Sequence, residues 1–356
     1  MSRPSFHALS VADVRREGED AVSVALTVPA ALRAAFRFTA GQYLTVRRPA
    51  DTSDVRRSYS LCSAPDEDDL RIGVREIPQG ALSTWLNREL APGMTLECMP
   101  PDGHFGAPLQ AAAGRHLLLI AVGSGITPML SIAKSALAAD PGTRVTLLYG
   151  NRRLATTMFR EDLEDLKNRY LQRFVVHYVF SRETQEVPLH DGRLNGARIG
   201  EFLAYLVPPA SVDHAFLCGP AAMLADAEDA LRTAGIAADR IHVERFGVAG
   251  IPDVVRAEMA APAGARVTVI VDGVRREIGF AHSTDSILDA ARAAGLDLPF
   301  SCKSGVCATC RARVLEGEVR MTRNFALMQT DLDAGIVLSC QAHPVTPRVV
   351  ISFDER

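Results

Sequence analysis

Short runs in which apolar and polar residues alternate fill the first third of the chain, from Phe6 to about Pro108. Gly, Pro and Asp residues separate these runs, and little of the segment has helical periodicity. The runs are VSVALTV, YLTVRR, RSYSL, LRIGVRE and TLECM. This pattern predicts an antiparallel β-barrel or sandwich, and we expect the barrel form as a domain over residues 1–110.

After Gly114 the pattern changes to apolar runs that alternate with stretches of helical periodicity. The apolar runs are typical of strands buried on both faces, and they read HLLLIAV, TRVTLLYG, RFVVHYVF, VDHAFLC and IHVERF. Helices are predicted from about Pro128 to Ala139, over FREDLEDLKNRYL, and from about Pro220 to Ala234. This alternation predicts a doubly wound parallel sheet, an α/β domain over residues 111–249.

Residues 250–264 are rich in Ala and Pro without clear periodicity, which predicts a linker. Two apolar runs then flank Asp272 and Gly273, a pair typical of a hairpin turn. A short helix follows over SILDAARAAG, which Ser283 or Asp285 could cap. With the runs RARVLEGEV and RVVISF, these elements predict an α+β domain over residues 265–356.

Composition and charge exclude several classes of protein. Of the 356 residues, 47% are hydrophobic and 23% are charged, which is typical of a folded multidomain protein and not of a disordered chain. The formal net charge of -3 argues against a protein that binds the nucleic-acid backbone. We therefore expect no nucleic-acid partner.

The chain carries no signal for a membrane or for export. No apolar stretch approaches the roughly 20 residues that cross a bilayer, and the N-terminal residues lack the apolar middle of a signal peptide. We expect a cytoplasmic protein with no membrane partner. In that reducing compartment the seven cysteines are expected to be metal ligands or core thiols rather than disulfides.

Four of the seven cysteines lie near the C-terminus. Cys302, Cys307 and Cys310 form a C-x4-C-x2-C pattern, and Cys340 follows 30 residues later. This is the plant-type spacing for a [2Fe-2S] cluster, because small residues between the cysteines let the loop wrap a compact cluster. A structural zinc site and metal-free core thiols are the alternatives, although zinc sites usually show two close cysteine pairs.

From about Arg266 onward, the signature LPFSCKSGVCATC resembles a plant-type ferredoxin. The resemblance implies a ferredoxin-like (β-grasp) domain that carries a [2Fe-2S] cluster on the four cysteines. Residues Arg266 to Arg356 include 11 basic and 11 acidic side chains, whereas free ferredoxins of this type are strongly acidic. A tethered domain needs less surface charge to find its donor, so we expect electrons to arrive from within this chain.

Short motifs in the first domain are candidates for a flavin site. The motif R-x-Y-S places Arg57 and Tyr59 on one strand face beside Ser60, where they could hold a phosphate and stack on a flat ring. Taken alone, this motif is more often an exposed Arg and a half-buried Tyr on an ordinary strand. The motifs G-x-x-S at residues 80–83 and P-D-G-H-F at residues 101–105 follow it.

Two turns in the second domain are candidates for a nucleotide site. Gly123 and Gly125, in G-S-G-I-T-P, directly follow the strand HLLLIAV and open a helix, where backbone amides could meet a pyrophosphate. Cys218 and Gly219, in C-G-P, end another strand. Because the carboxyl ends of parallel strands share one edge, both turns are expected to gather there.

The motifs R-x-Y-S, G-x-x-S, G-S-G-I-T-P and C-G-P, in this order and spacing, are similar to those of the ferredoxin-NADP reductase superfamily, from about Phe6 to Gly247. The resemblance implies an FAD site formed by Arg57, Tyr59, Ser60, Val74, Arg75, Gly80, Leu82 and Ser83. In such a site Arg57 and Ser83 hold the phosphates, while Tyr59 packs on the isoalloxazine and Ser60 lies near its N5. Some three-domain reductases of similar order use FMN instead.

The same resemblance implies the contacts of the nicotinamide nucleotide. Gly123, Gly125 and Thr127 would meet the nucleotide, and Cys218 and Gly219 would lie beside the nicotinamide ring. Cys218 could instead be a buried thiol at a strand end. The remaining cysteines of these two domains, Cys62 and Cys98, are expected in the core.

Coenzyme preference is predicted from Ser181 and Arg182, just after the strand RFVVHYVF. A hydroxyl and a guanidinium there could bind the adenosine 2'-phosphate, as in NADP-using members of the superfamily, so we expect NADPH even though Glu183 follows. Arg182 could instead be a solvated loop charge. Phe246, in VERFG, could cover the flavin as an aromatic gate or fill a domain junction.

Longer stretches resemble the reductase subunits of phenylacetyl-CoA epoxidases over nearly the whole chain. They are PSFHALSVADVRRE, RRSYSLCS, GSGITPMLSI, LLYGNRR and FREDLEDLK. The resemblance implies an oxidoreductase of phenylacetate catabolism that takes a hydride from NADPH and passes single electrons to di-iron oxygenase subunits. The alternatives are a stand-alone NAD(P)H reductase for another oxygenase or a hybrid-cluster protein, and, outside the enzymes, a zinc-stabilised redox sensor or interaction module.

Overall fold

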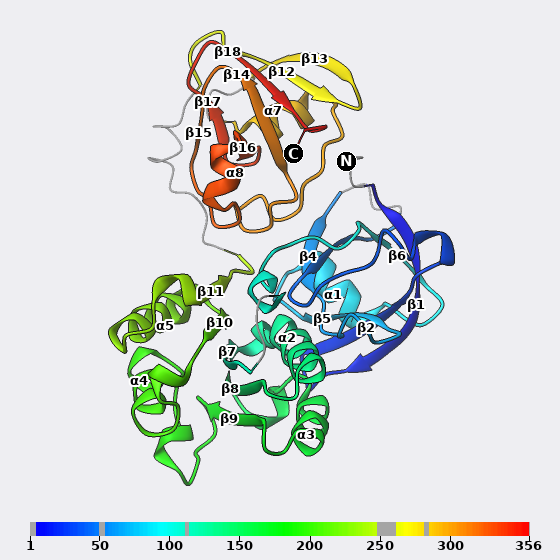
Figure 1. Ribbon diagram of the computed structural model, residues 1–356. Helices are drawn as coiled ribbons and strands as arrows, with labels where there is room; N and C mark the ends of the chain where they lie inside the picture. Colours follow the sequence, from blue (N-terminus) through cyan, green and yellow to red (C-terminus); the bar gives the residue numbers. More distant parts are fainter. Residues whose placement is uncertain (1–4, 50–53, 111–113, 248–260, 281–284, 356) are drawn as a thin grey trace. The chain divides into compact units, whose positions relative to one another are not determined.

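A computed structural model describes residues 5–49, 54–110, 114–247, 261–280 and 285–355 (Figure 1). The chain divides into two compact units, the larger formed mainly by His7–Val55 and Tyr59–Phe246 and the smaller mainly by Gly247–Arg356. Among the helices of the described residues, none combines the length and the apolar character that crossing a bilayer requires.

The N-terminal domain is an antiparallel barrel, as the alternating pattern predicts. Its strands are β1 (His7–Arg16), β2 (Ala21–Thr27), β3 (Tyr43–Arg47), β4 (Arg56–Ser60), β5 (Leu70–Arg75) and β6 (Thr95–Cys98). They are ordered β4-β3-β6-β1-β2-β5, and a bridge between Leu61 and Ile72 joins the two ends of the sheet. Apolar side chains of alternate strand positions fill the interior.

The helix α1 (Ala81–Arg88), which the sequence pattern did not predict, packs on this barrel. Its buried residues Trp85 and Leu86 belong to the barrel core. The helix is only eight residues long, and its apolar stripe is too short to stand out from the strands around it.

The nucleotide domain is the predicted parallel, doubly wound sheet. Its strands are β7 (His116–Val122), β8 (Arg144–Asn151), β9 (Phe174–Phe180), β10 (His214–Cys218) and β11 (Ile241–Glu244), in the order β11-β10-β7-β8-β9. All of its pairings are parallel. The helices are α2 (Ile126–Ala139), α3 (Arg160–Arg169), α4 (Gly196–Tyr205) and α5 (Ala221–Thr233).

Two apolar clusters lie on opposite faces of this sheet. Leu117 and Leu119 of β7 pack with α2 and α3, whereas Leu118 and Ile120 pack with α4 and α5. Figure 1 shows the two helix pairs separated by the sheet. The sequence pattern did not predict α4, because proline and polar residues precede it and its Gly196 and Gly200 weaken the helical signal.

The C-terminal domain is a mixed sheet with short helices. Its strands are β12 (Arg266–Val271), β13 (Val274–Gly279), β14 (Arg311–Glu316), β16 (Ile336–Leu338) and β18 (Arg348–Ser352), in the order β13-β12-β18-β14-β16. β15 (Val319–Met321) pairs with β17 (Ala342–Pro344), and the helices are α7 (Ile287–Ala293) and α8 (Gln329–Asp333). The parallel pair β12 and β18 lies between antiparallel neighbours, the arrangement expected of a β-grasp domain.

Details of this domain confirm the hairpin and correct the helix cap. Asp272 (φ 51°) and Gly273 (φ 73°) both have positive φ, as a two-residue hairpin turn requires. The cap of α7 is Ser286, whose side chain accepts the Asp289 amide, and not Asp285. Ser283 and most of the predicted linker 250–264 lie outside the described residues.

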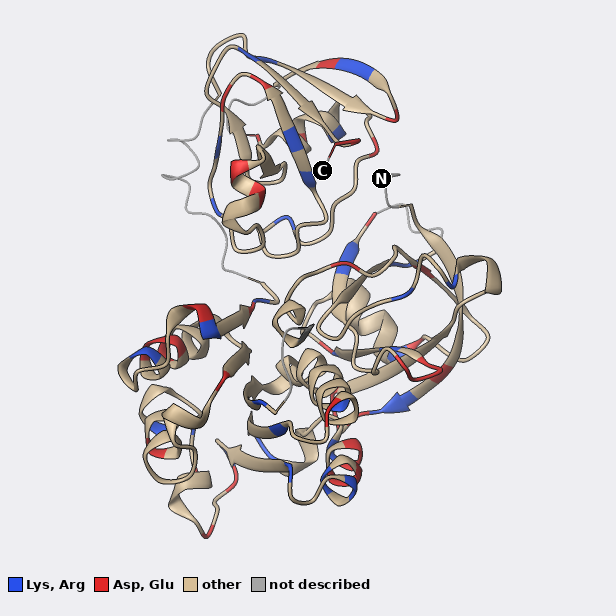
Figure 2. Ribbon diagram, in the orientation of Figure 1, with Lys and Arg blue, Asp and Glu red and all other residues tan. Residues whose placement is uncertain are grey.

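Charged residues of both signs are spread through this domain. Figure 2 shows acidic residues on α8 and basic residues on β14. Such interspersed charges match the equal counts of the two signs in the sequence, and they give the domain no strong net charge.

Candidate functional site

The loop between Phe300 and β14 carries three of the predicted cluster cysteines. Lys303 (φ 51°), Gly305 (φ 80°) and Ala308 (φ 51°) adopt left-handed backbone conformations in it. Changes of hand along a loop turn successive amides toward one side, which makes a concave surface for anions. The Ser304 amide donates to the Cys302 sulfur at 3.3 Å. The loop is therefore shaped to surround negatively charged sulfur.

The four cysteine thiols form two pairs. Cys302 and Cys307 lie within hydrogen-bonding reach of one another, and so do Cys310 and Cys340. Cys340 lies between β16 and β17, so the second pair joins distant parts of the chain. Three of the thiols are buried, and only Cys302 is half-buried.

Hydrogen bonding makes these thiols unequal in acidity. The bond with Cys307, helped by the amides of Ser304 and Val306, lowers the pKa of Cys302 to about 5. The bond with Cys302 and burial raise the pKa of Cys307, and the bond with Cys340 and burial raise that of Cys310. Negative charge therefore concentrates on the sulfur that the loop amides face.

Two pairs of thiols fit a two-metal centre better than a single ion. A structural zinc ion gathers four ligands around one point. Among the described residues, no group of three His, Cys, Asp or Glu side chains is gathered closely enough to hold one ion. A [2Fe-2S] cluster spreads its four thiolates over two irons, so the paired arrangement fits it.

The glycine turn after β7 meets the end of β10, as the parallel sheet predicts. Gly123–Gly125 form a short 3-10 turn, and α2 begins at Ile126. A Cβ atom at Gly125 would lie 2.1 Å from the carbonyl oxygen of Cys218. Only glycine can bring the two turns this close.

Neighbouring residues fix this turn in place. Thr127 is buried, and its hydroxyl donates to the carbonyl oxygen of Ser124 at 3.0 Å. The Tyr149 hydroxyl donates to the Gly123 carbonyl oxygen at 3.1 Å. A Cβ atom at Gly219 would lie 3.2 Å from Cβ of Val122, so the C-G-P turn also packs on β7.

Cys218 is a buried thiol of low acidity. It is 0% exposed, and burial raises its pKa well above its ordinary value. A thiol that keeps its proton is a poor nucleophile, so Cys218 could act beside a nicotinamide ring only through packing. Cys62 and Cys98 are likewise buried in apolar clusters, where core thiols are expected.

Backbone pairing brings several arginines to the edge where Ser181 and Arg182 lie. The Ser181 amide donates to Asn151 O at 3.0 Å, and the Arg182 amide donates to Arg152 O at 2.9 Å. Sequence reasoning missed Arg152 and the neighbouring Arg153, although the run G-N-R-R at the end of β8 was a usable signal. The Gly192 amide bonds to Phe180 O at 2.8 Å, which brings the exposed Arg193 to the same edge.

The acidic residue at this edge is held by the backbone. The Glu183 carboxylate accepts the Leu154 amide at 2.8 Å, at the start of a short 3-10 turn. This bond compensates part of its negative charge. The exposed Arg182 side chain and its arginine neighbours therefore add positive charge at this edge of the sheet.

On the flavin side, β4 presents the residues of R-x-Y-S with different exposure. Arg57 is exposed, Tyr59 is half-buried and Ser60 is buried. On β5, the Val74 side chain is fully buried in the barrel core, so only its backbone is available to a ligand. Arg75 donates to Thr156 O at 2.5 Å and so reaches the nucleotide domain.

The start of α1 offers backbone amides to an anion. Gly80 is the N-cap residue, and the Ser83 hydroxyl accepts the Ile77 amide and donates to Gly80 O, each at 3.1 Å. The Ser83 side chain thus holds the turn, and the amides of the first helical turn are the groups a phosphate would meet. The Leu82 side chain is buried in the barrel core.

Phe246 follows β11 and is 43% exposed. Its role over the flavin stays a prediction.

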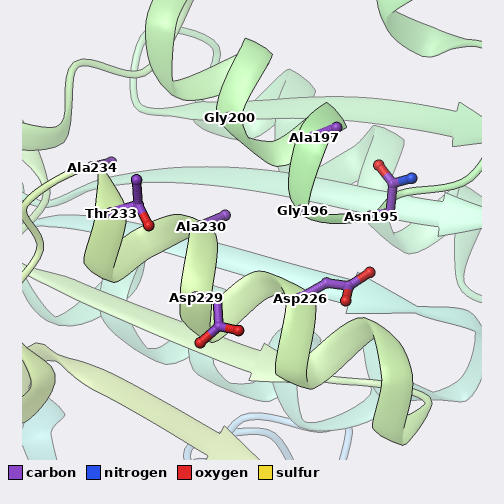
Figure 3. Close-up of a pocket in the computed structure, with 9 residues that line it drawn as sticks. All are labelled: Asn195, Gly196, Ala197, Gly200, Asp226, Asp229, Ala230, Thr233 and Ala234. Atoms are coloured by element: carbon purple, nitrogen blue, oxygen red, sulfur yellow. The ribbon is translucent and has the colours of Figure 1, made fainter.

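A groove of about 550 Å³ lies beside α4 and α5 (Figure 3). Small residues of both helices line it, with Asp226 and Asp229 of α5 among them. The lining includes no residue predicted to bind a cofactor and no aromatic or basic side chain that would suit a nucleotide. The groove is therefore not a candidate cofactor site.

Sequence reasoning missed the junction between the barrel and the nucleotide domain. The Glu17 carboxylate accepts the Phe159 amide at 3.0 Å, and the Glu19 amide donates to Ala155 O at 3.0 Å. A Cβ atom at Gly18 would lie 2.7 Å from Ala155 O. The turn after β1 thus docks on the connection between β8 and α3, but in the sequence it reads as an ordinary hairpin turn.

Glu17 is a buried acid at this junction. Burial raises its pKa, although hydrogen bonds from the Ser23 hydroxyl and the Phe159 amide act in the opposite direction. Phe159 has φ 56°, and a Cβ atom at Gly73 of β5 would lie 2.8 Å from its ring. The strained Phe159 backbone is held by contacts from the other domain.

Comparison with known proteins identifies the three domains. An oxidoreductase FAD-binding domain matches residues 9–106, an oxidoreductase NAD-binding domain matches 119–229 and a 2Fe-2S iron-sulfur cluster binding domain matches 269–345. The chain is 44% identical to a 1,2-phenylacetyl-CoA epoxidase subunit from Escherichia coli (strain K12), over 99% of both chains. The chain belongs to this family of flavin and iron-sulfur reductases.

Other members of the reductase family serve other oxygenases. The ferredoxin reductase component of 3-ketosteroid-9-alpha-monooxygenase from Mycolicibacterium smegmatis is 38% identical, over 98% of this chain and 97% of its own. The solved structure of phthalate dioxygenase reductase shares the fold, with a TM-score of 0.60, 24% identity and 98% of each chain covered. These comparisons confirm the fold class, the FAD, nicotinamide and [2Fe-2S] domains, and an oxidoreductase that serves an oxygenase.

Proposed function

We propose that this chain is the NADPH-dependent reductase that passes single electrons to the di-iron oxygenase subunits of a phenylacetyl-CoA ring-1,2-epoxidase. The observation that carries the proposal is the 44% identity to the Escherichia coli epoxidase subunit, which extends over 99% of both chains. The match extends over the flavin domain, the nucleotide domain and the iron-sulfur domain together.

The chain's own residues position the reactants. Bound FAD would convert a hydride into single electrons, and the [2Fe-2S] cluster would carry them one at a time. Arg57 and the first-turn amides of α1 bind the flavin phosphates, and Tyr59 and Ser60 lie at the flavin ring. Gly125 lets the turn after β7 approach the end of β10, at the edge of the sheet where the nicotinamide nucleotide would bind.

NADPH selection rests on the arginines at the ends of β8 and β9. Ser181 and Arg182 bind the 2'-phosphate, and Arg153 and Arg193 add positive charge at the same edge. The Glu183 carboxylate accepts the Leu154 amide, which compensates part of its repulsion of the phosphate.

In the iron-sulfur domain, Cys302, Cys307, Cys310 and Cys340 would hold the [2Fe-2S] cluster. Their two-by-two pairing supports this assignment. We place the domain limits at 1–110, 111–249 and 265–356, with residues 250–264 as the linker.

The test follows the visible spectrum of the purified protein during anaerobic addition of NADPH. We expect bleaching of both flavin and iron-sulfur bands in the wild type, and of flavin bands alone in Cys307→Ser. Adding the epoxidase oxygenase subunits and phenylacetyl-CoA should then give NADPH-dependent epoxide under air. A reduced chain that transfers no electrons to those subunits would contradict the proposed acceptor.

A second candidate acceptor is the oxygenase component of a steroid hydroxylase. It is favoured by the 38% identity over nearly full length to a 3-ketosteroid-9-alpha-monooxygenase reductase. The two candidates separate in one experiment, in which the reduced chain is offered either oxygenase with its own substrate and the product is measured.

A further inference from the structure

Gln341, next to the predicted ligand Cys340, is a fully buried polar residue with no assigned role. Its side chain is 0% exposed. The amide nitrogen lies 3.4 Å from the Cys340 sulfur, 3.1 Å from Lys303 O and 2.9 Å from Cys340 O. It therefore joins the Cys340 segment to the loop that carries the other three cysteines.

The neighbours of the amide fix its orientation. All three contacts are acceptors, two carbonyl oxygens and a sulfur, so the NH2 group and not the oxygen must face them. The Gln341 side-chain oxygen is then buried, and it has no hydrogen-bond partner among the described residues. A buried acceptor without a partner is unfavourable, so packing alone does not explain a glutamine here.

Other contacts keep the Gln341 side chain in place. The backbone amide of Thr322 donates to the backbone carbonyl oxygen of Gln341 at 3.0 Å. A Cβ atom at Gly305 would lie 3.2 Å from Cγ of Gln341, so the cluster loop closes directly over this side chain. The donor end is thereby held at the sulfur.

We propose that Gln341 is a positioning residue that ties Cys340 to the 302–310 loop and raises the reduction potential of the cluster through its N–H···S bond. The inference rests on the proposed assignment of Cys340 as a ligand. An added electron increases the negative charge on the cluster and its sulfurs, and a donor directed at one sulfur stabilises that reduced state more than the oxidised state. No proton or bond is exchanged.

The test is the midpoint potential of the cluster in Gln341→Met, in the full chain. Methionine keeps the length and apolar volume of the side chain but removes both N–H donors. We expect the reduced-to-oxidised ratio at a fixed potential to fall about tenfold, which corresponds to about 59 mV for one electron. The matched control is Thr322→Val, which removes only the bond from the Thr322 hydroxyl to Gln341 O and should leave the potential unchanged.

An unchanged potential in a Gln341→Met protein with full iron and sulfide content would overturn the inference. If that variant does not fold, the wild type answers the question: with 15N in its glutamine side chains, the reduced cluster should show a 15N hyperfine coupling, and absence of the coupling overturns the inference. Absence of iron and sulfide from the wild type would instead overturn the ligand assignment, and the inference with it.

Discussion

The cluster loop and the junction between the two larger domains both bring together segments that are distant in the sequence. They differ in how many of their residues lie close together along the chain. At the cluster, three of four thiols lie within nine residues, and one distant segment closes the site. At the junction, the turn after β1, strand β5 and the connection after β8 each contribute a few residues. A site with a fixed local spacing can be found in a sequence, whereas a site made from single residues of remote segments cannot.

The largest expected effect is at the locally encoded site. Cys340→Ser should abolish the cluster, because it removes the thiolate that the other three residues cannot replace. Iron and sulfide analysis and the visible spectrum check this. The control Cys98→Ala removes a core thiol instead and should keep the cluster at a cost of about 1–2 kcal/mol. A Cys340→Ser protein with a full cluster would contradict the assignment.

A methyl group at Gly125 tests the close approach at the nucleotide edge. The added Cβ would lie 2.1 Å from Cys218 O, so Gly125→Ala must displace one turn from the other. We expect flavin reduction by NADPH to slow about 100-fold, as for other displacements of about 1 Å. Stopped-flow absorbance measures it.

Gly200→Ala is the matched control for that methyl group. Gly200 lies inside α4, where an added Cβ would meet no atom within 4 Å, so the change should stabilise the protein by about 0.5–1 kcal/mol. Equal effects of the two alanines on flavin reduction would show that the close approach does not matter.

Arg182→Ala tests the proposed 2'-phosphate site at the ends of β8 and β9. Loss of a charge-assisted bond should raise the KM for NADPH about 10- to 100-fold and leave the KM for NADH unchanged. Steady-state kinetics with both coenzymes check this. Arg232→Ala, which removes an exposed arginine of α5, should change neither value. A parallel rise for both coenzymes would contradict a 2'-phosphate contact.

The smallest expected effect is at the domain junction. Glu17→Ala should destabilise the larger unit by about 1–3 kcal/mol, because the Phe159 amide loses its buried acceptor, and Glu17→Gln should cost less. Urea unfolding followed by fluorescence of Trp85, the single tryptophan, measures both.

The pH dependence of this effect has a defined sign. Burial raises the pKa of Glu17 in the folded state, so its contribution to stability is present below the unfolded pKa and is lost as pH rises through the folded pKa. The stability of the wild type relative to Glu17→Gln should therefore increase as the pH falls through the folded pKa of Glu17 toward its ordinary value of 4.5. An opposite slope would mean that Glu17 is stabilised in its charged form.

Much of the fold could be predicted from the sequence because apolar periodicity is local. The strand β7 and the cysteine loop before β14 were found from their residues alone. The helices α1 and α4 were missed, since α1 is short and α4 contains two glycines, and their stability comes from packing on a sheet.

The residues of the sites were predictable only where a motif states the chemistry. The cysteine spacing and the G-S-G turn carry such information. Gln341 and Glu17 carry none, because a single glutamine or glutamate is usually a surface residue. Their roles depend on neighbours at Lys303 and Phe159, and only the folded chain brings these together.

The Glu17 carboxylate also bears on how such reductases can be recombined. It accepts the backbone amide of Phe159, the N-cap residue of helix α3 in the other domain. Phe159 provides no side-chain cap of its own. A nucleotide domain grafted alone onto a foreign flavin barrel would leave that helix end unsatisfied. The barrel and the nucleotide domain should therefore be exchanged between enzymes as a pair, and chimeras that split them should need a replacement acid at position 17.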